Sequence, residues 1–445
     1  METVANFIHG ECVTGSGQRV QAIFNPATGE QIRQVVMSTA QETEQAIAAA
    51  QQAFPAWARH APLKRSRVMF RFKALLEENM DRLARLISEE HGKVFSDAVG
   101  ELTRGLEVVE FACGIPHLQK GEHSANVGTG VDSHSLMQPL GVCAGITPFN
   151  FPAMVPMWMF PIALATGNTF VLKPSEKDPS LALALAQLLK EAGLPDGVLN
   201  VVSGFGHEAG QALALHPDVE VITFTGSTRT GKQLLKDAGD SNMKRVWLEA
   251  GGKSANIVFA DCPDLQQAVR ATAGGIFYNQ GQVCIAGTRL LLEESIADEF
   301  LARLKAEAQH WQPGNPLDPD TTMGMLIDNT HADNVHSFIR GGESQSTLFL
   351  DGRKNPWPAA VGPTIFVDVD PASTLSREEI FGPVLVVTRF KSEEEALKLA
   401  NDSDYGLGAA VWTRDLSRAH RMSRRLKAGS VFVNNYNDGD MTVPF

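Results

Sequence analysis

Cysteine is scarce in this chain. Its 445 residues include only five cysteines: Cys12, Cys113, Cys143, Cys262 and Cys284. They are far apart and odd in number, which argues against a disulfide framework and favours a reduced, cytoplasmic location. No two of them have the close spacing of a zinc site, so we expect no metal.

Long hydrophobic runs are also lacking. The longest, residues 149–165, contains three prolines and Asn150, whereas a membrane-spanning helix needs about 20 mostly apolar residues. Residues 1–4 lack the basic start and apolar core of a signal peptide. We therefore expect the run to form a buried wall, and we expect no membrane contact.

Positive charge is in deficit. Lys+Arg 39 against Asp+Glu 51 gives 39 − 51 = −12, which argues against nucleic acid as a main partner. A hydrophobic content of 43% and a charged content of 20% are ordinary for a globular protein with a large core. The length favours two or three domains.

The first part of the chain has helical periodicity. Residues 25–30 read as a turn between two short strands, and helices are predicted over 41–57, 62–90 and 96–115, with Gly92 at a C-cap. Residues 124–140 are polar and β-like, which predicts a ribbon that packs on something else, for example another subunit.

Strands and helices alternate from Gly141 onward. Strands are predicted at 142–146, 169–172, 199–202, 219–225, 256–259, 290–292, 384–387 and 431–433, and helices at 160–165, 180–192, 264–278 and 296–310. This alternation predicts a parallel sheet with helices on both faces.

Cys284 lies among polar amides and glycines, just before an apolar strand. A structural cysteine normally sits in an apolar run, whereas the flanking Gln282 and Gly287 allow backbone N–H groups to approach a ligand. The setting suits a thiolate nucleophile; a buried bystander is the equal alternative.

Two stretches suit a dinucleotide. Gly226 and Ser227 join a strand to a helix whose N-terminus suits a pyrophosphate, although the usual three-glycine fingerprint is absent; an ordinary capped turn is the alternative. Lys173 and Glu176 follow another strand and could hold ribose hydroxyl groups, or form a solvated charge pair. An acid there favours NAD, because it would repel a 2′-phosphate.

Other positions suit chemistry at a carbonyl group. Glu249 lies between apolar residues and a double glycine, where it could act as a base with a raised pKa or pair with Lys253. Asn150 is an amide donor in an apolar wall, as an oxyanion site needs, or is structural. Glu379 could accept hydrogen bonds from a sugar hydroxyl, and the Phe381 ring could pack on a flat heterocycle. Alternatively, Glu379 is a solvated acid and Phe381 is a core aromatic residue.

Together these stretches resemble the aldehyde dehydrogenase superfamily over residues 6–445. The motifs that carry the resemblance are Pro148-Phe149-Asn150-Phe151-Pro152, Lys173-Pro174-Ser175-Glu176, Phe224-Thr225-Gly226-Ser227, Leu248-Glu249-Ala250-Gly251-Gly252-Lys253, Gly281-Gln282-Val283-Cys284 and Glu379-Ile380-Phe381-Gly382-Pro383. The resemblance implies an α/β fold with a Rossmann-type parallel-sheet NAD-binding domain (1–121 and 142–250), an oligomerisation ribbon (122–141) and an α/β catalytic domain (251–445).

The resemblance also implies roles for residues. Cys284 is the expected nucleophile and Glu249 the general base, and Asn150 with the Cys284 backbone N–H is the expected oxyanion hole. The expected cofactor is NAD, with NADP as an alternative, and its expected contacts are Thr147, Pro148, Phe149, Lys173, Glu176, Gly206, Gly226, Ser227, Glu379 and Phe381. The implied reaction oxidises a small-molecule aldehyde through a thioester, which activated water hydrolyses to an acid.

The two parts of the chain resemble different branches of the superfamily. Residues up to Lys190 resemble methylmalonate-semialdehyde dehydrogenase, on the runs 104–111 and 145–176. Residues from Gly204 resemble bacterial γ-glutamyl-γ-aminobutyraldehyde dehydrogenase, on the runs 281–289 and 433–440. We therefore expect a mosaic, or chimera, with a junction near 190–204.

Two positions favour hydrolysis over transfer of the thioester to coenzyme A. The methylmalonate branch lacks the acid of Glu249 and carries an arginine where this chain has Val283, while Arg104 matches that branch. The sequence thus predicts oxidation of ω-amino, γ-glutamylamino or aliphatic aldehydes. The alternatives are a coenzyme A-acylating methylmalonate- or malonate-semialdehyde dehydrogenase and a catalytically inactive family scaffold.

The chain stops at Val443-Pro444-Phe445, where family members usually continue with a glycine-rich segment and a strand that pairs with a partner subunit. We therefore expect a homodimer or homotetramer that is weakened by a missing tail, with an exposed sheet edge and reduced activity.

Overall fold

The computed structural model describes residues 1–440 and 443. It divides into two compact units. Unit 1 is Met1–Phe24, Gln31–Ile87 and Val99–Glu249, and unit 2 is Asn25–Glu30, Ser88–Ala98 and Ala250–Phe445. The predicted weakening of the oligomer depends on the chain end at Val443-Pro444-Phe445. Of these residues, only Val443 is among the described ones.

Unit 1 is built on a seven-stranded sheet in the order β12-β11-β8-β9-β10-β2-β3. Its strands are β2 (Asn6–Ile8), β3 (Glu11–Val13), β8 (Val142–Ile146), β9 (Thr169–Lys173), β10 (Leu199–Val201), β11 (Val219–Thr225) and β12 (Arg245–Glu249). β8 to β12 run parallel, and β2 and β3 extend the sheet in the antiparallel sense. The predicted parallel sheet is confirmed, so the carboxyl ends of β8 to β12 meet at one edge.

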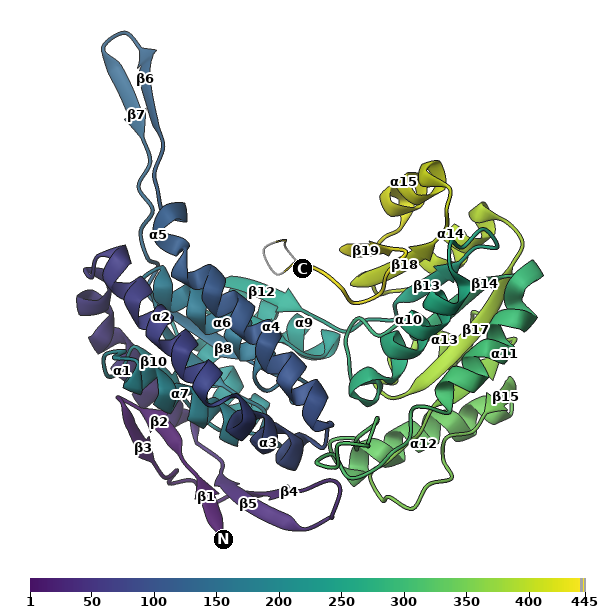
Figure 1. The fold of residues 1–445 in the computed structure, drawn as a ribbon. Coiled ribbons are helices and arrows are strands. Elements are labelled where there is room, and N and C mark those ends of the chain that lie inside the picture. The colour runs from purple at the N-terminus through teal and green to yellow at the C-terminus, as the bar shows by residue number, and fades with distance from the viewer. Residues whose placement is uncertain (441–442, 444–445) are drawn as a thin grey trace. The chain divides into compact units, whose positions relative to one another are not determined.

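Helices cover both faces of this sheet (Figure 1). On one face, α1 (Ala40–Ala58), α8 (Gln211–Leu215) and α9 (Thr228–Gly239) share a buried core with the strands, in which Ile47, Leu213 and Leu234 meet Ile222. On the other face, α6 (Met154–Ala165) packs on β8 and β9 with α2 (Pro62–Glu78) behind it, and α7 (Ser180–Glu191) packs on β10. Further helices are α3 (Met80–His91), α4 (Phe95–Cys113), α5 (Ile115–Leu118) and the π-turn η1 (Gly206–Gly210).

The single helix predicted over residues 62–90 is wrong. Asn79 ends α2 in a non-helical conformation, and its side-chain amide donates to the Leu75 carbonyl at 2.8 Å. The Asn79 backbone N–H also donates to the Leu75 carbonyl, at 3.1 Å, so this carbonyl accepts two hydrogen bonds where α2 ends. A new helix, α3, begins at Met80. The predicted C-cap is confirmed: α3 ends at His91, and Gly92 has φ +89°.

Helix α6 begins six residues before the predicted start at Phe160. The buried carboxylate of Glu101, on α4, accepts from the backbone N–H groups of Ala153 and Met154 at 2.6 and 3.2 Å. Because an acid at a helix N-terminus satisfies donors that have no partner within the helix, it fixes the start of α6 from outside the local sequence.

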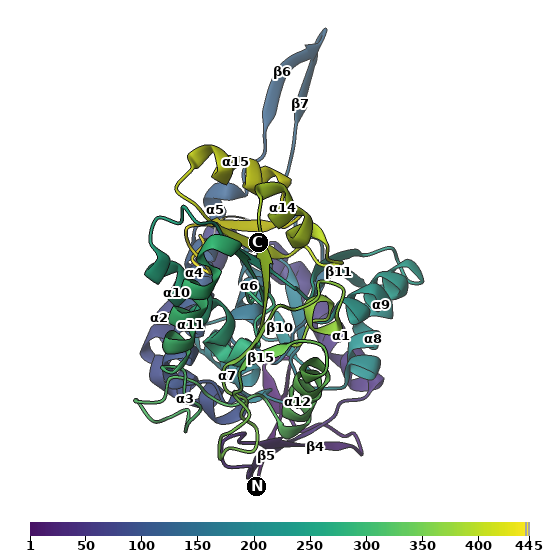
Figure 2. The same ribbon diagram turned by 90° about the vertical axis from the view of Figure 1, so that its right-hand side faces the viewer.

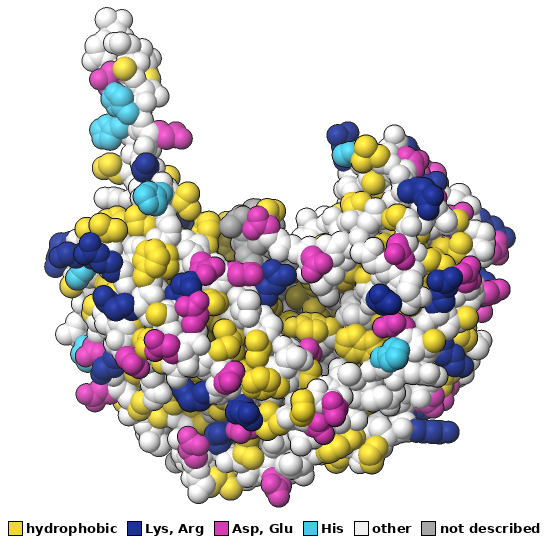
Figure 3. All heavy atoms as spheres, in the orientation of Figure 1, with side chains coloured by type: hydrophobic (Ala, Val, Ile, Leu, Met, Phe, Trp, Pro, Cys, Tyr) yellow, Lys and Arg dark blue, Asp and Glu magenta, His cyan; other side chains and the backbone are white. Residues whose placement is uncertain are grey.

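The predicted ribbon forms. β6 (His123–Gly128) and β7 (Val131–His134) make an antiparallel two-stranded sheet in which every residue is exposed (Figure 1). Figure 3 shows scattered hydrophobic side chains and histidines on this ribbon. A separate three-stranded sheet contains β1 (Glu2–Val4), β5 (Gln31–Val36) and β4 (Val20–Phe24), and the predicted turn joins the last two.

Unit 2 contains a second seven-stranded sheet, in the order β15-β16-β17-β14-β13-β18-β19. Its strands are β13 (Ala255–Val258), β14 (Arg289–Glu293), β15 (Thr347–Leu350), β16 (Thr364–Val367), β17 (Val384–Phe390), β18 (Gly408–Trp412) and β19 (Ser430–Val433). β15 pairs antiparallel with β16, and the other neighbouring strands are parallel.

Helices flank this second sheet as well. α10 (Leu265–Phe277) and α11 (Ala297–Ala308) lie side by side (Figure 2), and Asn256 on β13 donates to Thr272 on α10 at 2.8 Å. On the other face, α14 (Glu393–Asn401) and α15 (Leu416–Arg425) share a core with Ile257 and Leu291. α12 (Asn329–Glu343) and α13 (Thr374–Arg377) cover β16 and β17, and η2 (Tyr278–Gly281) and η3 (Glu294–Ile296) are short 3-10 turns.

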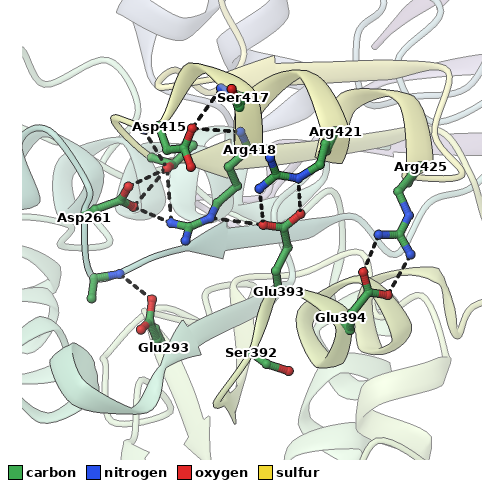
Figure 4. A network of polar contacts seen from close by, with 12 residues as sticks. Asp261, Glu293, Ser392, Glu393, Glu394, Asp415, Ser417, Arg418, Arg421 and Arg425 are labelled. Carbon is green, nitrogen blue, oxygen red and sulfur yellow. Dashed lines mark hydrogen bonds and ion pairs between the residues drawn. The ribbon is translucent and has the colours of Figure 1, made fainter.

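An ion-pair network holds α14 and α15 to the end of β13 (Figure 4). Arg418 contacts Asp261 at 2.8 Å and Glu393 at 3.3 Å, and Arg421 contacts Glu393 at 2.7 Å. The Arg418 guanidinium also lies 4.3 Å from the centre of the Phe259 ring. The network is partly exposed, so it orients the helices more than it stabilises them.

Two short segments that the sequence analysis assigned to the first domain belong to unit 2. The Phe95 N–H donates to the Pro316 carbonyl at 3.0 Å, and the Met325 N–H donates to the Gly92 carbonyl at 2.8 Å. Ala27 packs in a small core with Met325. These contacts are non-local, which is why the sequence pattern did not reveal them. Among the described residues, no helix is long and apolar enough to cross a membrane.

Candidate active site

Most of the predicted cofactor residues lie at the carboxyl edge of the unit 1 sheet. Thr147 to Asn150 follow β8, Lys173 ends β9, Gly206 follows β10, Gly226 and Ser227 follow β11, and Glu249 ends β12. In open α/β sheets this edge is where ligands bind. Adjacent parallel strands therefore bring together residues that are up to 102 positions apart in the sequence.

Ser227 is the N-cap of α9. Its Oγ accepts from the Thr230 N–H at 3.3 Å, and the Gly226 N–H donates to the Glu249 carbonyl at 3.0 Å. A Cβ on Gly226 would lie 2.5 Å from the Phe224 ring, so only glycine fits this turn. The turn is thus a capped one, and it also presents a helix N-terminus of the kind that binds phosphate groups.

Lys173 is buried, and its pair with Glu176 is not a solvated one. The Lys173 Nζ donates to the Pro174 carbonyl at 2.7 Å and lies 3.5 Å from Glu176 Oε2. Burial lowers the pKa of Lys173, and the nearby Glu176 opposes this shift. The ammonium is therefore held at the carboxyl end of β9, beside the Glu176 carboxylate.

Glu249 is half-buried at the end of β12, and burial raises the pKa of its carboxyl group. Asn150 is buried, with 3% of its surface exposed. The segment that holds it is anchored at one end by the Thr147 N–H, which donates to the Lys173 carbonyl at 3.1 Å, and at the other by Glu101. Sequence reasoning missed Glu101, because nothing near it on α4 indicates a partner.

Phe149 and Pro148 complete this segment. The Lys177 ammonium lies 5.2 Å from the centre of the Phe149 ring, a cation–π distance. Gly206 begins η1, and no heavy atom lies within 4 Å of the position that a Cβ would take there. This part of the edge is therefore open to a ligand.

In unit 2, Cys284 follows a tightly turned loop. Asn279, Gln280 and Gly281 have φ values of +48°, +57° and +72°, and Gln282 is fully buried. The Gln282 side chain accepts from the Ile327 N–H at 3.1 Å, which ties the loop to its surroundings. The Cys284 side chain is partly exposed, whereas Cys143 and Cys262 are buried.

Glycine packing fixes this loop. A Cβ on Gly252 would lie 2.1 Å from the Cys284 carbonyl oxygen, and a Cβ on Gly281 would lie 2.3 Å from the backbone of Gly382. The Tyr436 hydroxyl, which is buried, donates to the Ile285 carbonyl at 2.7 Å. Sequence reasoning did not single out Tyr436, since an aromatic residue after a strand is common.

Glu379 lies beside the double glycine of unit 2. Its Oε1 accepts from the Gly252 N–H at 3.0 Å, and burial raises the pKa of its carboxyl group. Phe381 has the rare φ of +58°, and its carbonyl lies 2.8 Å from His331 Nε2, whose ring also stacks edge-on against Phe381. His331, on α12, is a further residue that the sequence analysis missed.

The predicted residues therefore form two sets. Cys284, Glu379 and Phe381 belong to unit 2, at the amino ends of β14 and β17, whereas Asn150 and Glu249 belong to unit 1. Gly252 is the residue through which Cys284 and Glu379 are connected. The units meet in sequence between Glu249 and Ala250, within one predicted motif.

A Rossmann-type parallel sheet joined to a second α/β unit is an architecture found in dinucleotide-dependent oxidoreductases. The chain belongs to the aldehyde dehydrogenase family, whose model matches residues 13–445. It is an NAD(P)-dependent aldehyde dehydrogenase that acts on small-molecule aldehydes.

Several relatives are similar over nearly the whole chain. The NADP/NAD-dependent aldehyde dehydrogenase PuuC of Escherichia coli (strain K12) is 60% identical, over 99% of this chain and 89% of its own length. Malonate-semialdehyde dehydrogenase 2 of Bacillus thuringiensis subsp. konkukian (strain 97-27) is 42% identical, over 97% of this chain and 89% of its own length. The crystal structure of γ-glutamyl-γ-aminobutyraldehyde dehydrogenase from Burkholderia cenocepacia J2315 matches with a TM-score of 0.96 at 43% identity. The match covers 99% of this chain and 90% of that one.

Proposed function

We propose that this enzyme oxidises an ω-amino, γ-glutamylamino or aliphatic aldehyde to a carboxylic acid, with Cys284 as nucleophile and Glu249 as the base that activates the hydrolytic water. The observation that carries the hydrolytic step is Glu249 itself, a half-buried carboxyl group whose pKa burial raises. A carboxylate with a raised pKa is a stronger base near neutral pH than an exposed one.

The cofactor site fits a dinucleotide. Gly226 and Ser227 present the N-terminus of α9 to a pyrophosphate, and the buried Lys173 with Glu176 is suited to the adenosine ribose. Thr147, Pro148, Phe149 and Gly206 complete the wall around it. Glu379 accepts a hydrogen bond from the Gly252 N–H and would hold the nicotinamide ribose, and Phe381 would contact the nicotinamide. When bound, NAD(P) supplies the acceptor for the aldehyde hydride.

The protein residues would perform the covalent steps. The Cys284 thiolate attacks the aldehyde carbon, and the Asn150 amide with the Cys284 N–H donates to the oxyanion that forms. Loss of hydride regenerates the carbonyl as a thioester on Cys284. Glu249 removes a proton from water, which attacks the thioester and displaces the thiolate. The net products are the acid, reduced cofactor and released protons.

The substrate class rests on two positions and one relative. Val283 precedes the nucleophile and is buried, so it offers no cation to a carboxylated substrate. Arg104 lies 3.1 Å from Glu107 Oε2, so an acid already neutralises part of its charge. The Burkholderia relative is a γ-glutamyl-γ-aminobutyraldehyde dehydrogenase, whereas the Bacillus relative, a malonate-semialdehyde dehydrogenase, represents the competing substrate class.

A product assay tests the proposal. Purified enzyme is given a panel of γ-glutamylamino, ω-amino, aliphatic and malonate aldehydes with NAD or NADP, each with and without coenzyme A. We expect the free acid as product and no coenzyme A requirement. An obligatory coenzyme A requirement with an acyl-coenzyme A product would support the acylating alternative, and no turnover with any aldehyde would support the inactive scaffold.

Three further predictions belong with this proposal. We propose that the β6–β7 ribbon contacts a second copy in a dimer or tetramer, because its residues are all exposed, and that the enzyme is cytoplasmic. The predicted mosaic with a junction near 190–204 finds no support in the E. coli match, which covers 99% of this chain at an overall identity of 60%. Separate phylogenies of the two parts would test it.

A further inference from the structure

Cys284 lies at the tip of a tight turn. The Ala286 N–H donates to the Val283 carbonyl at 3.0 Å, so residues 283–286 form a β-turn. Cys284 and Ile285 are its two central residues. The Cys284 side chain is partly exposed there, and the conformation of the turn sets the directions of both its thiol group and its backbone N–H. Whatever holds the turn therefore also aims the proposed nucleophile.

The Tyr436 hydroxyl group holds the residue that follows the nucleophile. It donates to the Ile285 carbonyl at 2.7 Å, in a buried part of unit 2. This carbonyl and the Ala286 N–H belong to one peptide unit, and the N–H is already held by the Val283 carbonyl. Because both polar groups of the peptide unit have partners, the unit cannot rotate without leaving a buried polar group unsatisfied.

Close packing fixes the Tyr436 ring. Only 7% of the residue's surface is exposed, and the ring centre lies 5.6 Å from that of Phe432 on β19. A Cβ on Gly275 would lie 2.8 Å from the ring, and a Cβ on Gly287 would lie 3.0 Å from the hydroxyl oxygen. A larger residue at either position would press on the ring, so the two glycines leave just the space that the ring fills. The hydroxyl group therefore has little freedom to move.

The position and the chemistry of this hydrogen bond both bear on the nucleophile. The accepting carbonyl is one residue from Cys284, and the far end of the turn is tied to α10, because the Gly287 N–H donates to the Gly275 carbonyl at 3.0 Å. Burial raises the pKa of the Tyr436 hydroxyl group, so this group keeps its proton and remains a donor at neutral and alkaline pH. The turn is therefore held in the same way over the pH range in which a thiolate forms.

We propose that Tyr436 is a positioning residue for the nucleophile, because its hydroxyl group fixes the turn that carries Cys284. This inference rests on the proposed role of Cys284. In the fixed turn, the thiolate and the Cys284 N–H are directed at the same aldehyde group, one to attack its carbon and the other to donate to the oxyanion. Without the hydroxyl group the Ile285 carbonyl loses its donor, and the turn can leave this orientation.

The test is the rate of NADH formation in a single turnover, measured by stopped flow as a function of pH with a good aldehyde substrate. Tyr436→Phe keeps the ring and removes the hydroxyl group. We expect this rate to fall roughly tenfold, because a shift of a fraction of an ångström misaligns the reacting atoms. The NAD dissociation constant and the apparent pKa of the rate profile should stay at their wild-type values, since the substitution moves the turn and leaves the charge of the thiolate unchanged.

Ser66→Ala is the matched control. The Ser66 hydroxyl group also makes a buried hydrogen bond to a backbone carbonyl, that of Cys113 at 2.6 Å, and neither residue belongs to the candidate site. Its removal should lower the midpoint of urea unfolding to a similar extent as Tyr436→Phe. The single-turnover rate of this variant should remain at the wild-type value.

Three results would overturn the inference: a wild-type rate in Tyr436→Phe, an equal loss of rate in Ser66→Ala, or a loss that is explained by a shifted apparent pKa of the thiol group. If Tyr436→Phe does not fold, Gly287→Ala replaces it, because the added Cβ presses on the same hydroxyl group, and it should slow the same step. Wild-type enzyme that forms no NADH with any aldehyde would contradict the proposed reaction, and with it this inference. Equal rates of NADH formation in wild type and variant would overturn only the role of Tyr436.

Discussion

Gly252→Ala tests whether backbone packing positions the nucleophile. The added Cβ would lie 2.1 Å from the Cys284 carbonyl oxygen, whereas such contacts are essentially never shorter than 3.0 Å. The loop that carries Cys284 must therefore retreat by about 1 Å, since the obstacle is backbone and cannot rotate away. Gly252 has no positive φ, so the substitution introduces no other strain.

The expected consequence is kinetic. A displacement of about 1 Å in a reacting group can lower turnover by about 100-fold, which is about 2.7 kcal/mol in the activation barrier. Overpacking should also cost about 1–3 kcal/mol of the free energy of unfolding. The assay is kcat/KM for a good aldehyde substrate, together with the rate at which a thiol reagent alkylates Cys284 in the absence of aldehyde.

Gly274→Ala is the matched control, because no heavy atom lies within 4 Å of its Cβ position in α10. We expect unchanged activity and a small gain in stability, of about 1 kcal/mol, from the better helix propensity of alanine. Gly252→Ala enzyme with wild-type kcat/KM and wild-type alkylation would refute the idea that this contact sets the position of Cys284.

Three further outcomes are expected. Cys284→Ala should lower turnover by at least about 10³-fold and leave NAD binding intact, whereas Cys12→Ser, at an exposed cysteine, should keep activity; equal losses in a turnover assay would contradict the assignment. Glu101→Ala should lower the free energy of unfolding in denaturant by about 2–4 kcal/mol, since a buried and a partly buried N–H group lose their acceptor; a loss no larger than in Thr103→Ala would argue against this role of Glu101. Because the pKa of Lys253 is lowered to about 7, the folded state binds fewer protons than the unfolded state between about pH 7 and 10.5, so burial of Lys253 costs stability that is recovered as pH rises through that range. Lys253→Met should accordingly stabilise the fold more at about pH 6 than at about pH 10 in urea unfolding, and the opposite trend would contradict the shift.

Much of the fold follows from local pattern. The apolar strands β8, β9, β11 and β13 are short runs between turn residues, and alternation with helices dictates a parallel sheet. In a parallel sheet the carboxyl ends of neighbouring strands meet at one edge. Because Ser227 follows a predicted strand and precedes a predicted helix, the sequence alone could place it at this edge. The exposed ribbon was likewise predictable, because residues 124–140 have no apolar face of their own.

Other features depend on contacts that are distant in the sequence. The start of α6 is fixed by Glu101, which lies 52 residues before Ala153. The break between α2 and α3 falls at Asn79, whose backbone leaves the helical conformation within an otherwise unbroken helical pattern. His331 and Tyr436 hold backbone carbonyls near the candidate site. No residue type or spacing around them signals that role, so only the three-dimensional packing reveals it.

The most direct test of the central claim uses Glu249→Gln. If Cys284 forms the thioester and Glu249 activates the hydrolytic water, this variant should form the thioester but release it slowly. Mixed with NAD and a good aldehyde substrate and quenched in acid, it should gain the mass of the acyl group, and peptide mapping should place that mass on Cys284. The absence of an adduct, or an adduct on another residue, would contradict the account.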